Sequence, residues 1–294
     1  MKMQLSGTGV ALVTPFLPSN VVDHDALRTL VDHVIGGGVD FLVILGTTGE
    51  SATLSSQEQD EVIQTIVKAN QNRVPYVIGA GGNDTGKVVR RIQELDEQYE
   101  ATAYLSVVPY YSKPSQKGLE RHFGLIAGAT SKDIILYNVP GRTALNMVPE
   151  TSLRLAQEHT NIVAIKEASG DLEACMDLVK GAPDGFNVLS VEDTLFLPLL
   201  LVGMRGVISV AANAVPAEFS SIVRAGLNGD FQKAKALHLK YLNLMRMFFK
   251  EGNPTGVKAA LALRGIGTKT VRSPLFEASP ELEALIGKEL RELG

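Results

Sequence analysis

Short runs of apolar and β-branched residues alternate with amphipathic stretches along most of the chain. In the first amphipathic stretch Leu27, Leu30 and Val34 recur at the spacing of one helix face. The second stretch begins with a capping box, formed by Ser55 and Glu58, which marks the start of a helix. Eight apolar runs of strand length separate such stretches: 10–13, 41–45, 76–79, 103–108, 134–137, 162–165, 187–189 and 207–210.

This alternation of strand and helix patterns predicts the fold class. Parallel strands joined by helical crossovers need both faces of their sheet covered, and eight such units close naturally into a (β/α)8 TIM barrel. An open doubly wound sheet is the alternative that the pattern leaves open. After Pro216 no strand pattern recurs. We therefore predict an α/β fold with a catalytic barrel at 1–226 and a C-terminal helical region at 227–294, packed as one unit.

Composition and charge exclude several classes of protein. Hydrophobic residues make up 45% and charged residues 20% of the 294 residues, so a large core can form without a metal or a disulfide. The formal net charge is -4 and both signs are interspersed, which argues against a nucleic-acid partner. A lone cysteine, no export-signal pattern and no long apolar run favour a cytoplasmic protein without membrane association.

Polar residues that follow the apolar runs are the first candidates for a site, because a βα barrel carries its active site at the carboxyl ends of its strands. The second run leads into Gly46, Thr47, Thr48, Gly49 and Glu50. Two hydroxyls and several backbone N–H groups in a tight turn can hold a carboxylate. A simple glycine-rich turn between strand and helix has the same sequence, and this segment alone does not separate the two interpretations.

Lys166 ends the sixth apolar run, whereas most lysines of the chain lie on the polar faces of predicted helices. A lysine that points into a dry barrel loses hydration, so its pKa falls and its neutral amine can form an imine with a carbonyl substrate. The alternative is a lysine that points outward past the end of the strand, and the spacing leaves both open.

Two further strand ends carry side chains that could take part in chemistry. The fifth run ends at Tyr137 and is followed by Arg142, a phenol that can pass a proton and a guanidinium that can bind a carboxylate. A buried structural tyrosine and a surface arginine would give the same sequence. After the fourth run come Tyr110 and Tyr111, which predict an aromatic loop at the barrel mouth or a sealed rim or interface.

Other candidate chemistries have weaker signals. The five histidines are scattered over helix-like segments without the spacing of zinc ligands, so we expect no metal site. The glycine-rich turn at 79–82 matches neither the dinucleotide fingerprint nor the P-loop. Cys175 has no histidine nearby in the sequence that would activate it, and is expected to be a helix core residue.

Four of these motifs, taken together, carry a family resemblance. The turn at 46–50, the tyrosine pair at 110–111, the segment Tyr-Asn-Val-Pro-Gly-Arg at 137–142 and the Lys-Glu pair at 166–167 resemble the dihydrodipicolinate synthase family in order and spacing. The likeness covers nearly the whole chain. It implies that Lys166 condenses with pyruvate and that the enamine attacks L-aspartate 4-semialdehyde, giving 4-hydroxy-tetrahydrodipicolinate in lysine and diaminopimelate biosynthesis. It implies no cofactor beyond this covalent imine.

The same resemblance implies a role for each site residue. The implied catalytic set consists of Lys166, Tyr137, Thr47 and Tyr111. The implied substrate-binding set consists of Thr48, Gly49, Ile208 and Arg142. Tyr137 would shuttle protons through Thr47 to Tyr111, which a neighbouring subunit contributes, so a dimer would be the smallest active unit and a homotetramer is expected. The Thr48 turn would hold the pyruvate carboxylate, and Arg142 would hold the semialdehyde carboxylate.

Two departures from the family pattern change the expectation. Val191 stands where many members have glycine, and its side chain would narrow the pocket or shift the loop if that position had positive φ. Ser56, Gln59 and Lys87 stand where lysine-inhibited members have two histidines and a glutamate. An effector ammonium would lose an acidic partner and meet a like charge, so we predict weak or absent inhibition by lysine, to be tested by initial rates across lysine concentrations.

Other functions remain as alternatives to the synthase. The nearest is another pyruvate-dependent aldolase, such as N-acetylneuraminate lyase or a 2-keto-3-deoxy sugar acid aldolase. Arg142 favours the synthase, because a polyol substrate has less need of that cation. A remote alternative is a non-catalytic ligand-binding paralogue, which the joint presence of Lys166, Tyr137 and Thr47 argues against.

Overall fold

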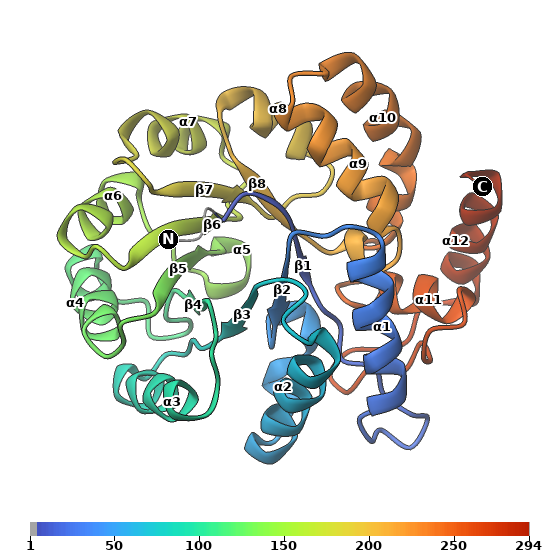
Figure 1. The fold of residues 1–294 in the computed structure, drawn as a ribbon, viewed down its shortest axis with the longest axis horizontal. Helices are drawn as coiled ribbons and strands as arrows, with labels where there is room; N and C mark the ends of the chain where they lie inside the picture. Colours follow the sequence, from blue (N-terminus) through green and yellow to red (C-terminus); the bar gives the residue numbers. More distant parts are fainter. Residues whose placement is uncertain (1–4, 294) are drawn as a thin grey trace. The chain divides into compact units, whose positions relative to one another are not determined.

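The computed structural model describes residues 5–293, and its strands β1 to β8 form a closed barrel in which each strand neighbours the next along the chain (Figure 1). The predicted (β/α)8 barrel is therefore confirmed. The strands are β1 Gly7–Ala11, β2 Phe41–Ile44, β3 Tyr76–Gly79, β4 Ala103–Val107, β5 Asp133–Asn138, β6 Ile162–Glu167, β7 Asn187–Ser190 and β8 Gly206–Ser209.

Helices alternate with the strands as predicted. The helices are α1 His24–Gly36, α2 Ser56–Asn70, α3 Thr85–Gln98, α4 Gln116–Ala127, α5 Pro140–Thr143, α6 Pro149–Glu158, α7 Leu172–Gly181, α8 Phe196–Val202, α9 Pro216–Leu227, α10 Phe231–Met247, α11 Thr255–Leu263 and α12 Pro280–Leu293. The periodicity did not indicate two short helices that the structure adds, α5 and α8. Three short 3-10 helices are η1 Thr47–Gly49, η2 Ser51–Thr53 and η3 Ala211–Asn213. The predicted face of α1 is buried, and the Ser55–Glu58 capping box begins α2.

The first strand differs from its predicted position at 10–13, because it begins earlier, at Gly7. Its first residues are small or polar and so lack an apolar pattern, yet packing requires one of them to be small. A Cβ at Gly9 would lie 2.3 Å from the ring of Phe41 on β2, a distance that no real contact allows. Glycine therefore lets β1 and β2 pair closely, with Gly9 opposite Phe41.

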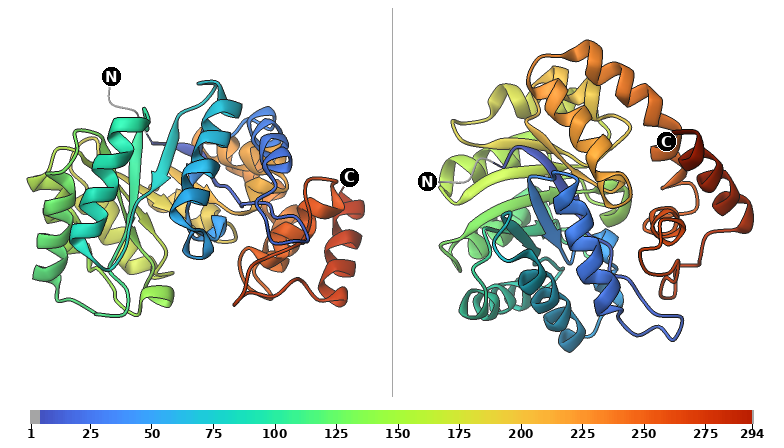
Figure 2. Two further views of the ribbon diagram at one scale, coloured as in Figure 1. Left: turned by 90° about the horizontal axis from the view of Figure 1, so that it is seen from below. Right: turned by 45° about the vertical axis from the view of Figure 1, so that its right-hand side comes forward.

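One compact unit comprises residues 5–6 and 76–208, and it contains β3 to β7 and most of β8. Its strands pair in parallel, and the register places Tyr137 of β5 beside Lys166 of β6. Helix α6 packs against α4 and α7 (Figure 2). Parallel pairing of β5 with β6 therefore brings two of the predicted site residues together.

The second compact unit comprises residues 7–75 and 209–293. It contains β1, β2, α1, α2 and the C-terminal helices, in which α10 packs against α9 and α12 packs against α10 and α11 (Figure 2). The predicted C-terminal helical region is thus in direct contact with the helix that precedes it. The proposed division into 1–226 and 227–294 stays a prediction.

Candidate functional site

Lys166 lies near the end of β6 and is 3% exposed. Burial lowers the pKa of its ammonium to about 7, against a smaller opposing effect of the Asp193 carboxylate. Its Nζ lies 4.3 Å from the ring centroid of Tyr137, which is itself buried on β5. No residue within 5–293 hydrogen-bonds this Nζ. The amine is therefore shielded from bulk solvent, close to a phenol and available to react.

Charged side chains of both signs act on this amine from the same compact unit. Asp193 and Glu192 raise the pKa of Lys166, and Arg142 lowers it. Burial raises the pKa of the Glu192 carboxyl. The positive charges of Arg142 and Lys166 partly offset that rise. Arg142 is exposed on the short helix α5, and its guanidinium has no ion pair with residues 5–293. That cation is free to bind an anionic group of a substrate.

A polar network holds the ends of β5 and β6 and the segment that carries Arg142. Asn138 donates from Nδ2 to both carboxylate oxygens of Glu167, at 3.2 and 3.0 Å, and to Asn146 at 2.7 Å. Its Oδ1 accepts from the backbone N–H of Met147 at 3.0 Å. Both Asn138 and Glu167 are buried. The network therefore holds the end of the 139–147 segment, just before α6, against Asn138 at the end of β5.

The hydroxyl turn belongs to the second compact unit, where η1 follows β2. Thr48 is 3% exposed and its Oγ1 accepts a hydrogen bond from Asn253 Nδ2 at 2.9 Å, while Thr47 is exposed. Gly49 is packed so closely that a Cβ there would lie 3.1 Å from the Leu12 carbonyl oxygen. The turn is thus a tightly held structure with one buried hydroxyl.

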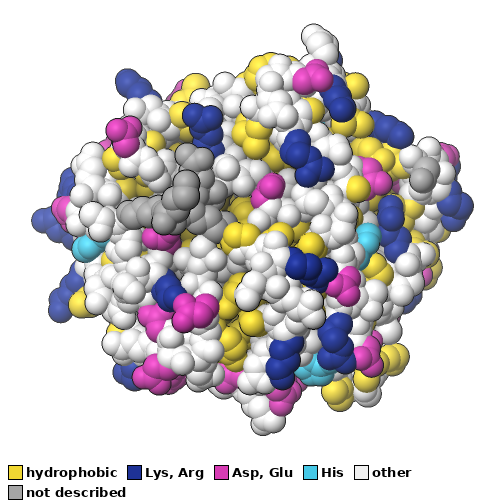
Figure 3. Space-filling view, viewed as in Figure 1, with side chains coloured by type: hydrophobic (Ala, Val, Ile, Leu, Met, Phe, Trp, Pro, Cys, Tyr) yellow, Lys and Arg dark blue, Asp and Glu magenta, His cyan; other side chains and the backbone are white. Residues whose placement is uncertain are grey.

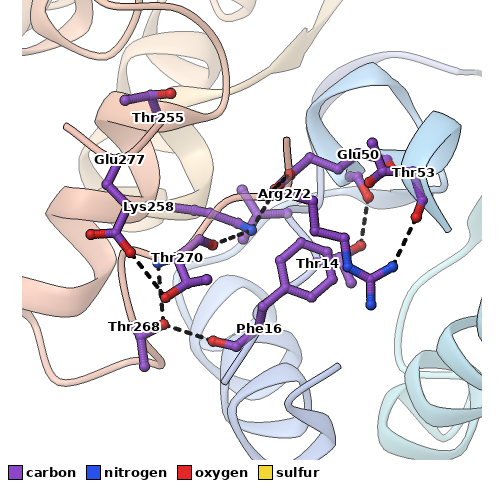
Figure 4. A network of polar contacts seen from close by, with 12 residues as sticks. Thr14, Phe16, Glu50, Thr53, Thr255, Lys258, Thr268, Thr270, Arg272 and Glu277 are labelled. Atoms are coloured by element: carbon purple, nitrogen blue, oxygen red, sulfur yellow. Dashed lines mark hydrogen bonds and ion pairs between the residues drawn. The ribbon is translucent and has the colours of Figure 1, made fainter. Parts of the chain in front are cut away.

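Glu50, at the end of this turn, is the centre of a buried polar cluster (Figure 4). Its φ is 52°, in the left-handed region that most side chains avoid, so the conformation needs support. Lys258 Nζ of α11 lies 2.5 Å from Glu50 Oε1, and the backbone N–H of Arg272 donates to Oε2 at 2.8 Å. The Arg272 guanidinium in turn binds Glu58 and the Thr53 carbonyl. These bonds tie the turn to the C-terminal helical region.

The other predicted site residues lie in contrasting surroundings. Ile208 is buried on β8, and its assignment to a pocket stays a prediction. Tyr111 is 90% exposed, with a φ of 71°, and follows Tyr110, which is partly exposed. Val191 does not have positive φ, so the loop shift expected for that case does not arise. Gln59 donates to the Ser51 carbonyl at 3.1 Å, and the expectation about lysine inhibition stays a prediction.

Surface charge and possible metal ligands give no further candidate site within residues 5–293. On the face shown in Figure 3, lysine and arginine side chains lie next to aspartate and glutamate side chains. Within residues 5–293 no three or more His, Cys, Asp or Glu side chains are grouped as metal ligands. No helix in that range has the length and the apolar character needed to cross a membrane.

Sequence reasoning missed Asn253 and Lys258, which hold the turn, and Asn138, which holds the 139–147 segment. The sequence did indicate that Lys258 is unusual, because it is the single charged residue of the helix 255–263. A lysine that is buried in such a helix and keeps its charge needs an oppositely charged partner. Its partner Glu50 lies 208 residues away in the sequence, and no local pattern identifies that pairing.

Comparisons with known proteins identify the family of the chain and agree with its fold. The chain matches the model of the Dihydrodipicolinate synthetase family over residues 4–293. It is 50% identical over 276 residues to a 4-hydroxy-tetrahydrodipicolinate synthase of Flavobacterium psychrophilum, covering 94% of each chain. A crystal structure of dihydrodipicolinate synthase from Aquifex aeolicus has a TM-score of 0.94 at 40% identity, covering 98% of each chain. A variant described as monomeric has a TM-score of 0.96 at 36% identity, covering 99% of this chain and 97% of its own.

Proposed function

Because this chain belongs to the dihydrodipicolinate synthetase family, we propose that it condenses pyruvate with L-aspartate 4-semialdehyde to give 4-hydroxy-tetrahydrodipicolinate, with Lys166 as the covalent catalyst. The observation that carries this proposal is the state of Lys166. Its amine is buried, its pKa is lowered to about 7 by burial, and no described residue hydrogen-bonds it. A neutral amine of this kind is the nucleophile that imine formation requires.

The chemistry follows from that amine. Nζ of Lys166 attacks C2 of pyruvate, and loss of water gives an iminium whose positive nitrogen acts as an electron sink. Removal of a proton from C3 then gives an enamine, and C3 bonds to the aldehyde carbon of the semialdehyde. The amino group of that substrate attacks C2, which closes the ring and releases Lys166. Tyr137 is the proton carrier in this scheme, a role that its position beside Nζ supports.

Substrate recognition is assigned to charged and polar groups. Arg142 binds the semialdehyde carboxylate, supported by a guanidinium without an ion pair among the described residues. Thr48 and Gly49 bind the pyruvate carboxylate, and Ile208 lines the pyruvate pocket. Pyruvate is a substrate in this reaction and not a separate cofactor. We propose a cytoplasmic location, which the biosynthetic role and the lone cysteine support.

Tyr111 is assigned to the site of a neighbouring subunit, with Thr47 linking it to Tyr137. Its side chain is 90% exposed although it is aromatic, and its backbone is held in the left-handed region. A large aromatic side chain presented in this way is typical of one that becomes buried in an interface. We therefore propose at least a homodimer, with a homotetramer as the expected assembly.

The proposal is tested by reductive trapping. Borohydride with pyruvate should leave one stable adduct on Lys166, detected by peptide mass spectrometry, and Lys166→Ala should lose both the adduct and turnover. Lys180→Ala, an exposed lysine of α7 in the same compact unit, is the matched control and should keep both. No adduct on the wild-type protein would refute the covalent mechanism.

A coupled assay separates this function from that of related aldolases. Turnover of pyruvate with L-aspartate 4-semialdehyde is expected, with little cleavage of N-acetylneuraminate or of 2-keto-3-deoxy sugar acids. The reverse preference would favour a different pyruvate-dependent aldolase, and trapping without turnover of any of these would favour a ligand-binding paralogue.

A further inference from the structure

The buried hydroxyl of Thr48 is held by a residue from the C-terminal helical region. Asn253 lies between α10 and α11, directly before Pro254, and its side-chain amide donates to Thr48 Oγ1 at 2.9 Å. Both residues are buried, at 9% and 3% exposure. The two residues are 205 positions apart, so this contact joins the strand-end turn to the start of α11.

The direction of this hydrogen bond determines what the hydroxyl can do next. An amide nitrogen only donates, so Thr48 Oγ1 uses a lone pair as acceptor and keeps its own proton. No residue within 5–293 accepts that proton. The structure directs the amide nitrogen of Asn253 to Thr48 Oγ1 and leaves Asn253 Oδ1 without a hydrogen bond.

The other end of the turn is fixed independently. Glu50 is held in its left-handed conformation by Lys258 of α11 and by the backbone N–H of Arg272 (Figure 4). Lys258 also donates to the Thr270 carbonyl at 2.9 Å. With Glu50 anchored, the backbone of Thr48 cannot easily shift to compensate for a change at Asn253. A change at Asn253 should therefore act mainly on the direction of the Thr48 hydroxyl.

We propose that Asn253 is a positioning residue for pyruvate, which donates to Thr48 Oγ1 and thereby directs the Thr48 proton toward the pyruvate carboxylate. This inference rests on the proposed function, which assigns that carboxylate to Thr48. A hydroxyl whose acceptor site is already occupied is preorganised as a donor, so less ordering is needed when the anion binds. Asn253 itself does not touch the substrate in this scheme.

The test is Asn253→Asp, which keeps the shape of the side chain but replaces the donor by an acceptor. The Thr48 proton should then turn to the new carboxylate, and the KM for pyruvate should rise about tenfold or more, the usual effect of losing a hydrogen bond to a charged group. The KM for L-aspartate 4-semialdehyde and kcat should change by less than about threefold. Asn228→Asp, at an exposed position after α9, is the matched control and should leave both KM values unchanged.

A double-mutant cycle separates positioning from a structural role. In a Thr48→Val background, Asn253→Asp should add less than about twofold to the KM for pyruvate, because the hydroxyl it acts through is gone. If Asn253→Asp does not fold, Asn253→Ala replaces it in the same cycle. A KM for pyruvate within twofold of the wild type, or equal effects with and without Thr48, would overturn the inference.

The reductive trapping of pyruvate distinguishes failure of this inference from failure of the proposed function. If the wild-type protein traps pyruvate on Lys166 and Asn253→Asp traps it at the same pyruvate concentrations, only the inference is wrong. If the wild-type protein traps no pyruvate, the proposed function is wrong and the inference is refuted with it.

Discussion

The buried lysines Lys166 and Lys258 differ in what their ammonium groups meet. Lys258 is 1% exposed, and it donates to Glu50 and to the Thr270 carbonyl. Burial lowers its pKa to about 8, but the Glu50 carboxylate opposes that effect and favours the charged form. Lys166 has no hydrogen bond with residues 5–293, and burial lowers its pKa further, to about 7. Burial alone therefore does not make a nucleophile, and the absence of a bound carboxylate distinguishes Lys166.

The pH dependence of imine formation should show this difference. A neutral amine is required, so the initial rate of pyruvate trapping with cyanoborohydride should rise as the pH increases through about 7 and level off above it, because the pKa of Lys166 is lowered to about 7. An ordinary lysine, with a pKa near 10.4, would give a rate that is still rising at pH 9. Circular dichroism at each pH checks that the protein stays folded. A midpoint near 10 would contradict a desolvated amine.

For single residues, the sequence shows which side chain is unusual better than it shows which groups that side chain contacts. Lys166 was predictable, because a lysine that ends an apolar strand stands apart from lysines on polar helix faces. The pairing of Lys258 with Glu50 was not, because the two residues are 208 positions apart and meet only after the chain has folded. The loop shift expected at Val191 depended on positive φ, a backbone property that composition does not reveal.

Among the elements, the segment between β5 and α6 departs most from the predicted pattern. The structure adds α5, four residues long, which is too short to produce a helical period in the sequence. Its position depends on Asn138, which bonds Glu167, Asn146 and the Met147 backbone at once. The ends of β5 and β6 could be predicted from apolar runs, whereas the network that links them to α5 could not.

Asn138→Ala should therefore destabilise the protein by about 2 to 4 kcal/mol, because it leaves the buried Glu167 carboxylate and the Met147 N–H without this partner. Unfolding in urea measures the change. The KM for L-aspartate 4-semialdehyde should also rise, since Arg142 lies in the segment that loses its anchor. Asn146→Ala, which removes only the exposed partner of Asn138, is the control and should cost less than about 1 kcal/mol. Equal losses for the two variants would argue against the network.

Considered as a whole, the molecule combines a barrel that the sequence predicts with long-range contacts that it does not. Alternating strand and helix patterns determine the number and order of the barrel units, because each pattern is local. Asn253, Lys258 and Arg272 contact the turn at 48–50 only once the C-terminal region has folded against it. No local sequence pattern predicts these long-range contacts. The C-terminal helical region is therefore part of the machinery that shapes the turn and not an independent appendage.

In the assembled molecule Tyr111 acts either in the active site of its own subunit or in that of a neighbouring subunit, and a mixture of two variants distinguishes these cases. Lys166→Ala and Tyr111→Phe should each be nearly inactive alone. If Tyr111 acts on a neighbouring site, co-expression of the two in equal amounts should restore about one quarter of wild-type activity. Half of the dimers are then mixed, and each mixed dimer has one site with both native residues. If Tyr111 acts within its own subunit, the mixture stays inactive, because every site then lacks one of the two groups. Sedimentation of the mixture checks that the subunits assemble into dimers or tetramers, and the recovery of activity then measures where Tyr111 acts.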